Sequence, residues 1–414
     1  MRGELTAPRE AGVGTELATG SCMATTPSIW ARIWDAIASL KLTIACLVCL
    51  MVLVVACTLA QVRLGTLGAV TAYIRSAVVW WQVPGTGFRL PVFPGGLTVG
   101  VVLLANLVVA QGRRLEASWS KSGLWLVHAG LILLFVGEFV SGARQVEMQL
   151  AIEEGQTVSF LESPRDLELA ITDVTDPLLD QVHGIPESLL AHQKLIAVPG
   201  TPLSLRIERY YQNAELSRRP ESDSISLATA GVGTSLVARE LAPVSRDDER
   251  DLRVVYLEPI AGGKSYGTWL VSNALGAPQS FIHQGRKYTL SLRQRREYLP
   301  YSLTLKKFSH DLYPGTDIPR NFSSLVHLSN PAHGEERDVI ISMNQPLRYA
   351  GKAFYQASFG KNDTLSILQV VENPGWLLPY LSCVLVAAGL VLHFALSLGR
   401  SLRRRRPALI AAEA

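Results

Sequence analysis

The sequence is poor in charged residues, which make up 18% of its 414 positions, against about 25% in soluble globular domains. Apolar side chains account for 48% of the chain, and its mean hydropathy is +0.21. This composition argues against a wholly soluble protein, a disordered chain and a coiled coil. The formal net charge is only +4, without the clustered basic face that indicates nucleic-acid binding, so no nucleic-acid partner is expected.

Cysteine is absent from the centre of the chain. The five cysteines are Cys22, Cys46, Cys49, Cys57 and Cys383. The region between the last two therefore has no disulfide, thiolate metal site or dithiol redox pair of its own. The CxxC formed by Cys46 and Cys49 lies in an apolar run, where cysteine behaves as a small buried hydrophobe. A thiol-redox function is accordingly disfavoured.

The central region also lacks the common catalytic motifs. It has no GxSxG, no HExxH and no glycine-rich phosphate loop. Its histidines, none in a pair with metal-ligand spacing, are His183, His192, His283, His310, His327 and His333. We predict no catalytic residue and interpret each of these as an ordinary surface or strand histidine, with His283 and His310 adjoining the most distinctive sequence.

Four apolar stretches are long enough to cross a membrane, which takes about 20 residues. They are residues 42–61, 94–112, 122–141 and 374–399. The first lies too deep in the chain and is too long to be a cleaved signal peptide. We therefore expect four transmembrane helices.

Basic residues set the predicted orientation, because they concentrate at the cytoplasmic ends of membrane spans. Ten of them fall on one side of four spans: Arg32, Lys41, Arg113, Arg114, Lys121, Arg400 and Arg403 to Arg406. Only Arg63, Arg75 and Arg89 oppose them in the short loop on the other side. We expect the protein in the inner, cytoplasmic membrane, with both termini in the cytoplasm and residues 143–373 outside it.

The segments around the spans are assigned by the same reasoning. Residues 1–27 are expected to be a flexible cytoplasmic leader, and residues 400–414 a basic cytoplasmic tail. Residues 28–41 predict an amphipathic helix at the interface, because apolar residues from Ile29 to Ile37 share one helical face. Residues 62–93 form the outer loop.

Aromatic residues gather in that outer loop. They are Tyr73, Trp80 and Trp81. Such residues prefer the headgroup zone of a membrane, so anchoring is the first interpretation. An aromatic platform for a planar ligand is the second.

Residues 143–373 change from a helical to an alternating apolar pattern. Strand-like runs occur at 203–211, 252–257, 288–293, 301–308, 337–343 and 365–371. Turn sequences such as VPGTP and YPGTD separate them, and residues 177–195 are interpreted as a helical or irregular insertion. Short strands at this spacing predict a large all-β extracytoplasmic domain, sandwich-like or barrel-like, between the third and fourth spans.

Two histidines lie inside the predicted spans, where ionisable groups are costly and indicate function. At 1.5 Å per residue, His128 lies roughly 9 Å and His393 roughly 7 to 8 Å from the cytoplasmic ends of their helices. Neutral imidazole ligates haem iron well, so two rings at one depth could hold a porphyrin. The alternative is a histidine hydrogen-bonded to a neighbouring helix. Glu138, near the outer end of the third span, is expected to face water.

Several blocks resemble the ResB proteins of cytochrome c biogenesis, also called CcsB. The longest is LPVFPGGLTVGVVLLANLVVAQGRRLEASWSKSGLWLVHAGLILLFVGEFVSG. The opening SLKLTIACLVCLMVLVVACTLAQ is similar to that family's first span, and YPGTDIPRNFSS and ISMNQPLRYAGKAFYQASF are similar to its recurring soluble blocks. The resemblance extends over residues 28–400.

The resemblance implies a haem-handling subunit of a cytochrome c maturation complex. Such a protein works with a CcsA-type, WWD-containing membrane protein to export haem and support its attachment to apocytochrome c. His128 matches the histidine that ligates haem iron within the membrane in that family. The resemblance implies that the bound group is b-type haem in transit. In that family the second membrane ligand comes from the CcsA-type partner, and His393 is the in-chain alternative. Any synthetase activity belongs to the complex, so this chain alone is not expected to be an enzyme.

Two other interpretations stay open. In one, the chain is a purely structural membrane scaffold whose β domain recruits the partner or apocytochrome c without binding haem. In the other, it is a thiol-redox component of the same pathway, which the cysteine distribution disfavours. Membrane lipid and thiol-reducing proteins of the pathway complete the expected partners.

Overall fold

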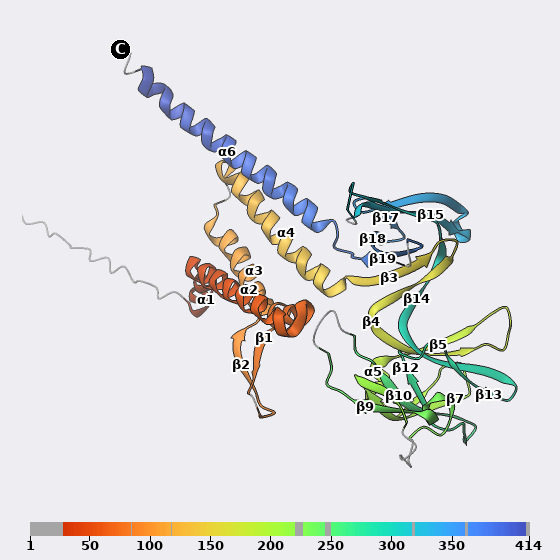
Figure 1. Cartoon of the computed structure of the whole chain (residues 1–414). Coiled ribbons are helices and arrows are strands. Elements are labelled where there is room, and N and C mark those ends of the chain that lie inside the picture. Colours follow the sequence, from red (N-terminus) through yellow and green to blue (C-terminus); the bar gives the residue numbers. More distant parts are fainter. Residues whose placement is uncertain are drawn as a thin grey trace, which may run out of the picture.

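The computed structural model consists of a group of long helices and a β domain to one side of them (Figure 1). It describes residues 28–410 apart from 84, 117, 220–226, 245–249, 317–318 and 361–362. The leader predicted at 1–27, with Cys22, and the last residues of the predicted tail, 411–414, lie outside the described residues.

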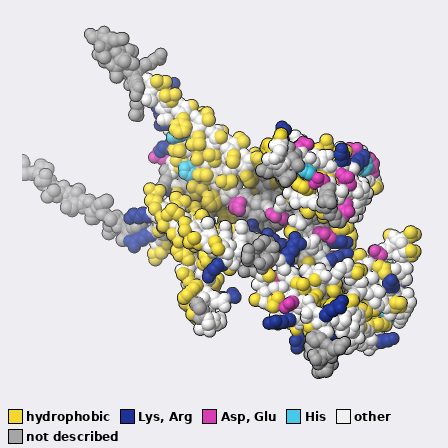
Figure 2. Space-filling view, in the orientation of Figure 1, with side chains coloured by type: hydrophobic (Ala, Val, Ile, Leu, Met, Phe, Trp, Pro, Cys, Tyr) yellow, Lys and Arg dark blue, Asp and Glu magenta, His cyan; other side chains and the backbone are white. Residues whose placement is uncertain are grey.

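Within this described part, four helices are long and apolar enough to cross a membrane. They belong to α2 (Leu40–Ala69), α3 (Gly96–Arg114), α4 (Ser122–Arg144) and α6 (Leu378–Ile410). Three precede the β domain and one follows it, as predicted. Hydrophobic side chains cover these helices densely, whereas charged side chains gather on the β domain (Figure 2).

The short helix α1 (Ile29–Ile37) precedes α2 and is fixed to α3 by one buried side chain. The amide nitrogen of Asn106 donates to the carbonyl oxygens of Ile37, at 2.5 Å, and Ser39, at 3.1 Å. Its amide oxygen accepts from the Thr43 hydroxyl at 2.7 Å. Because Asn106 is only 2% exposed, these bonds satisfy a polar group that would be costly to leave unpaired between helices.

The expected outer loop is largely ordered. Helix α2 continues to Ala69 through a kink at Gly65, and a single π-helical turn, η1 (Val70–Ile74), follows it. Next, β1 (Val78–Gln82) and β2 (Arg89–Pro94) form an antiparallel hairpin that exposes Trp80 and Trp81. Pro94 therefore ends a strand rather than beginning a helix.

Helices α4 and α6 pack closely because glycines line their contact. Gly123, Gly130 and Gly137 are seven residues apart on one face of α4. A Cβ atom at Gly130 would lie 2.7 Å from Val386 Cγ2, closer than real carbon atoms approach. The Ser382 hydroxyl also donates to the Gly130 carbonyl oxygen at 2.7 Å. Small residues and interhelical hydrogen bonds of this kind hold helices together inside a membrane.

The β domain has two lobes, and the lobe that is attached to α4 and α6 is a rolled antiparallel sheet. Its strands are β3 (Val146–Glu153), β4 (Thr157–Asp173), β14 (Arg286–Leu312), β15 (Pro319–Asn330), β16 (Glu335–Ser342), β17 (Leu347–Tyr349), β18 (Lys352–Gly360) and β19 (Leu365–Glu372). Their order is β16-β15-β14-β4-β3-β19-β18-β17, and β16 also contacts β17 and β18, so the sheet nearly closes into a barrel. One apolar core, including Leu150, Leu303 and Phe354, fills it.

The other lobe has a separate core that includes Leu169, Leu205 and Leu257. Its elements are β5 (Gln181–Pro186), α5 (Glu187–His192), β6 (Leu195–Ala197), β7 (Leu203–Tyr211), β8 (Ala214–Arg218), β9 (Leu236–Glu240), β10 (Val254–Ala261), β11 (Lys264–Ser265), β12 (Trp269–Ser272) and β13 (Gln279–His283). The short helix α5 makes the domain predominantly β rather than all-β.

Strands β4 and β14 run through both lobes and join them. The two strands predicted at 288–293 and 301–308 are one 27-residue strand, β14, because a register shift between Tyr298 and Leu303 accommodates Pro300 within it. Four ion pairs bridge the two strands: Glu162–Arg296 at 2.9 Å, Asp166–Arg295 at 3.3 Å, Glu168–Arg293 at 3.1 Å and Asp173–Arg286 at 3.3 Å. Acidic residues on β4 thus match basic residues on β14.

Candidate functional site

His128 lies in the first half of α4, half-buried, and its own helix holds its ring. The Nδ1 atom is 2.8 Å from the carbonyl oxygen of Leu124, one turn earlier. Since a carbonyl oxygen only accepts hydrogen bonds, Nδ1 carries the proton of the neutral ring and Nε2 keeps its lone pair. No residue in the described part of the chain hydrogen-bonds to Nε2. This is the tautomer and the second hydrogen bond that metal-ligating histidines use.

His393 lies in α6 and is also half-buried. Its Nδ1 atom is buried and has no hydrogen-bond partner within the residues that the structure describes. The ring contacts Phe394 edge to face, with 5.8 Å between ring centroids. Its orientation is thus set by packing rather than by a polar contact.

The two histidines lie at different levels along the α4–α6 pair. A Cβ atom on Gly123 would be 2.5 Å from the backbone nitrogen of His393, so these two residues are level. His128 follows Gly123 by five residues, roughly 7 to 8 Å along the helix axis and about 140° around it. The expected common depth is therefore replaced by an offset along the helix pair.

Glu138 is exposed near the β-domain end of α4. It lines a hollow of about 460 Å³ between the helices and the β domain. Arg75 and Arg165 line the same hollow, so charges of both signs face it.

The β-domain histidines are distributed over both lobes. In the described part of the chain, no group of three or more His, Cys, Asp and Glu side chains could hold a metal ion. His327 lies between two carboxylates, with Nδ1 at 2.7 Å from Asp338 and Nε2 at 2.8 Å from Glu336. Hydrogen bonds to these acids, Asp338 first, raise the pKa of His327 above its ordinary value.

The other two noted histidines make single polar contacts. Nδ1 of His310 is 3.2 Å from an oxygen of Asp363, and its ring stacks on Phe359. His283 is buried, and its Nδ1 is 2.5 Å from the hydroxyl of Tyr266. Neither contact is part of a group of three or more metal-ligating side chains among the described residues.

Sequence reasoning missed one charged contact at the junction of helices and β domain. The Arg348 guanidinium lies 4.5 Å from the ring centroid of Trp376, just before α6. Close by, the Asn373 amide donates to the Ser141 hydroxyl at 3.0 Å and to Gln145 at 3.3 Å. The available signal was the position of Trp376 beside the fourth apolar stretch, but its partner is 28 residues away in the chain.

The fold and this site together define a class: a protein with four helices apolar enough to cross a membrane, a two-lobed β domain between the third and fourth, and an imidazole within a helix. Residues 264–368, which run from β11 into β19, match the model of the ResB-like family. The chain belongs to the ResB-like family, as its sequence blocks predicted.

A second comparison agrees with this assignment. The chain is 36% identical over 298 residues to Protein NrfI of Wolinella succinogenes. The match covers 71% of this chain and 29% of that protein, so the chain spans less than a third of the length of this relative.

Proposed function

We propose that this chain binds haem in the membrane through Nε2 of His128 and supports cytochrome c maturation. One observation carries the proposal: the hydrogen bond to Leu124 places the proton on Nδ1 and leaves the lone pair of Nε2 available. Membership of the ResB-like family supports the pathway. In this proposal haem is the cargo, which the chain holds in transit.

The residues around His128 would act by orientation and by excluding water. The Leu124 carbonyl oxygen would fix the ring, and the apolar residues of α4 would limit the access of water to it. His393 lies roughly 7 to 8 Å away along the helix axis. We therefore propose that a partner protein supplies the second ligand of the haem iron. His393 is the in-chain alternative, and its substitution is compared with that of His128.

The proposed setting is the inner membrane, with both termini in the cytoplasm and the β domain outside. The basic residues at one end of the spans, such as Arg113 and Arg400, support this orientation. The proposed partners are a CcsA-type, WWD-containing membrane protein and apocytochrome c. Any synthetase activity is assigned to that complex rather than to this chain.

The full chain, co-expressed with a CcsA-type partner and purified, provides the test. We expect His128→Ala to lower the Soret absorbance per protein by at least about tenfold, since an axial bond is lost. His192→Ala is a matched control, because its Nδ1 also lies 2.8 Å from a carbonyl oxygen one turn earlier, that of Ser188, but in the β domain. This control should keep its haem.

Undiminished haem in His128→Ala would favour the structural scaffold. In that case the β domain would recruit partners, and the membrane helices would only anchor it. The positions of the cysteines do not support the thiol-redox alternative, because Cys46 and Cys49 are free thiols within the apolar helix α2.

A further inference from the structure

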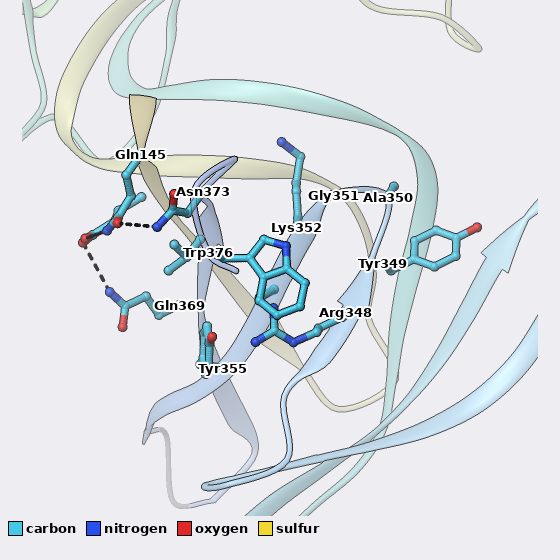
Figure 3. A pocket seen from close by; sticks show the side chains of 13 residues that line it. Gln145, Arg348, Tyr349, Ala350, Gly351, Lys352, Tyr355, Gln369, Asn373 and Trp376 are labelled. Atoms are coloured by element: carbon cyan, nitrogen blue, oxygen red, sulfur yellow. Dashed lines mark hydrogen bonds between the residues drawn. The ribbon is translucent and has the colours of Figure 1, made fainter. Parts of the chain in front are cut away.

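A cavity of about 610 Å³ opens where the helices meet the lobe that is attached to α4 and α6 (Figure 3). It lies between the start of β3 and the segment that joins β19 to α6. Gln145, one residue after α4, and Trp376, two residues before α6, both line it. Because both residues adjoin the ends of apolar helices, the cavity lies at the boundary of the membrane.

Exposed aromatic residues mark the same level. Trp376 is 47% and Tyr380 61% exposed, and their rings meet edge to face with 6.1 Å between centroids. Tryptophan and tyrosine concentrate at the headgroup level of a bilayer, where one side of the ring is apolar and the other wet. Exposed Leu377 and Leu381 continue this surface towards the hydrocarbon region.

The cavity also holds a cation outside the ion pairs of the described residues, while Glu147, the carboxylate in the same lining, accepts hydrogen bonds from Gln145 and Gln369. Arg348 is exposed and lies over Trp376, and no carboxylate among the described residues forms an ion pair with it. Lys352, which lines the same cavity, differs, because it is already paired with Glu297 at 2.9 Å and Glu372 at 2.5 Å. Arg348 is therefore the cation that can receive an anion from outside the chain.

The geometry of Arg348 suits a phosphate. An arginine stacked on an aromatic face keeps its planar fork of N–H donors directed sideways, where it matches two oxygens of a phosphate group. Figure 3 shows the Arg348 guanidinium beneath the Trp376 indole, with Tyr355 and Gln369 on the neighbouring strands. Tyr355 adds a neutral hydroxyl to the lining, whereas the Gln369 amide already donates to the Glu147 carboxylate at 3.3 Å.

We propose that this cavity binds the headgroup phosphate of a phospholipid in the leaflet on the β-domain side. The lipid is favoured over free phosphate because the cavity opens beside exposed apolar side chains that would contact its acyl chains. The proposal concerns a site distinct from His128 and does not depend on haem binding.

Native mass spectrometry of the full chain tests it, by counting the phospholipids that stay bound after a detergent wash. We expect Arg348→Ala to reduce the occupancy of the most tightly held phosphatidylglycerol by about tenfold, the worth of one charge-assisted hydrogen bond. Arg348→Lys should retain part of the lipid binding, and Trp376→Phe should retain more of it. These graded losses distinguish a weakened site from a misfolded protein. Arg337→Ala is the matched control, because Arg337 pairs with Glu335 on β16, away from the cavity lining.

Three outcomes would overturn the proposal. The first is equal lipid occupancy in wild type and Arg348→Ala. The second is displacement of the lipid by inorganic phosphate at millimolar concentration, which would make this a free-phosphate site. The third is a loss of haem in Arg348→Ala with unchanged lipid occupancy, which would assign Arg348 to the haem carboxylates.

Discussion

Gly123 of α4 packs directly against the backbone of His393 in α6. A Cβ atom at Gly123 would lie 2.5 Å from the His393 nitrogen and 2.7 Å from its Cα. The contact is backbone to backbone, so no change of side-chain rotamer could make room for a larger residue. It therefore fixes the register between α4 and α6, and with it the position of His128 relative to His393.

The first prediction concerns this contact. Gly123→Ala should destabilise the full chain by about 1 to 3 kcal/mol, because the added methyl group must push two helices apart. Gly142→Ala is the matched control on the same helix, since nothing lies within 4 Å of a Cβ atom there. That substitution should be neutral or stabilise the helix by up to about 1 kcal/mol. Thermal unfolding of both variants in the same detergent measures the difference, and equal effects would contradict the packing described.

The second prediction separates a buried from an exposed ion pair between β4 and β14. Arg293 and Glu168 are 20% and 9% exposed, whereas Arg295 and Asp166 are 46% and 63% exposed. Arg293→Met should lower the free energy of unfolding by about 2 to 3 kcal/mol, because it leaves a buried carboxylate unpaired. Arg295→Met should cost less than about 1 kcal/mol.

Denaturant unfolding followed by circular dichroism compares these two variants. Adding Glu168→Gln to Arg293→Met should recover part of the loss, because the remaining buried charge disappears. A cost of Arg295→Met as large as that of Arg293→Met would show that burial does not govern these pairs.

The third prediction is a pH dependence at His327. Its pKa is raised by Asp338 and Glu336, so its contribution to stability is fully present below the ordinary histidine value of 6.5. It is lost as the pH rises through the raised pKa of the folded state. The pKa values of Asp338 and Glu336 are lowered, so their contributions are lost as the pH falls through those lowered values.

His327→Gln should therefore lower the melting temperature more at about pH 6 than at about pH 9. His333→Gln is the control, because His333 is exposed on the neighbouring turn η4 (Pro331–His333) and has no carboxylate partner in the described part of the chain. A pH-independent effect of His327→Gln would contradict the assigned contacts.

The sequence predicted the helices and the β character well because both follow from local patterns. Apolar runs near 20 residues long marked the helices, and alternation marked strands such as β7 and β19. Strand β14 was divided in two because only its two alternating runs were recognised, whereas the structure joins them through a register shift around Pro300. The β1–β2 hairpin was missed because its aromatic residues indicated only a preference for the interface.

The candidate site was predictable in identity but not in geometry. An ionisable residue in an apolar run singled out His128 and His393 without any structure. Their relative level depends on how Gly123 meets α6, which is a contact between residues far apart in the chain. The pairing of Arg348 with Trp376 is long-range in the same sense, and no local pattern encodes it.

Imidazole rescue of His128→Gly tests the central claim most directly. The substitution removes the ring and leaves a space for a free ligand, so the variant, purified with its CcsA-type partner, should show a weak Soret band. Adding imidazole should restore that band, while the same addition to His393→Gly should change it much less. A His128→Gly protein that keeps full haem without imidazole, or never regains it with imidazole, would contradict ligation by His128.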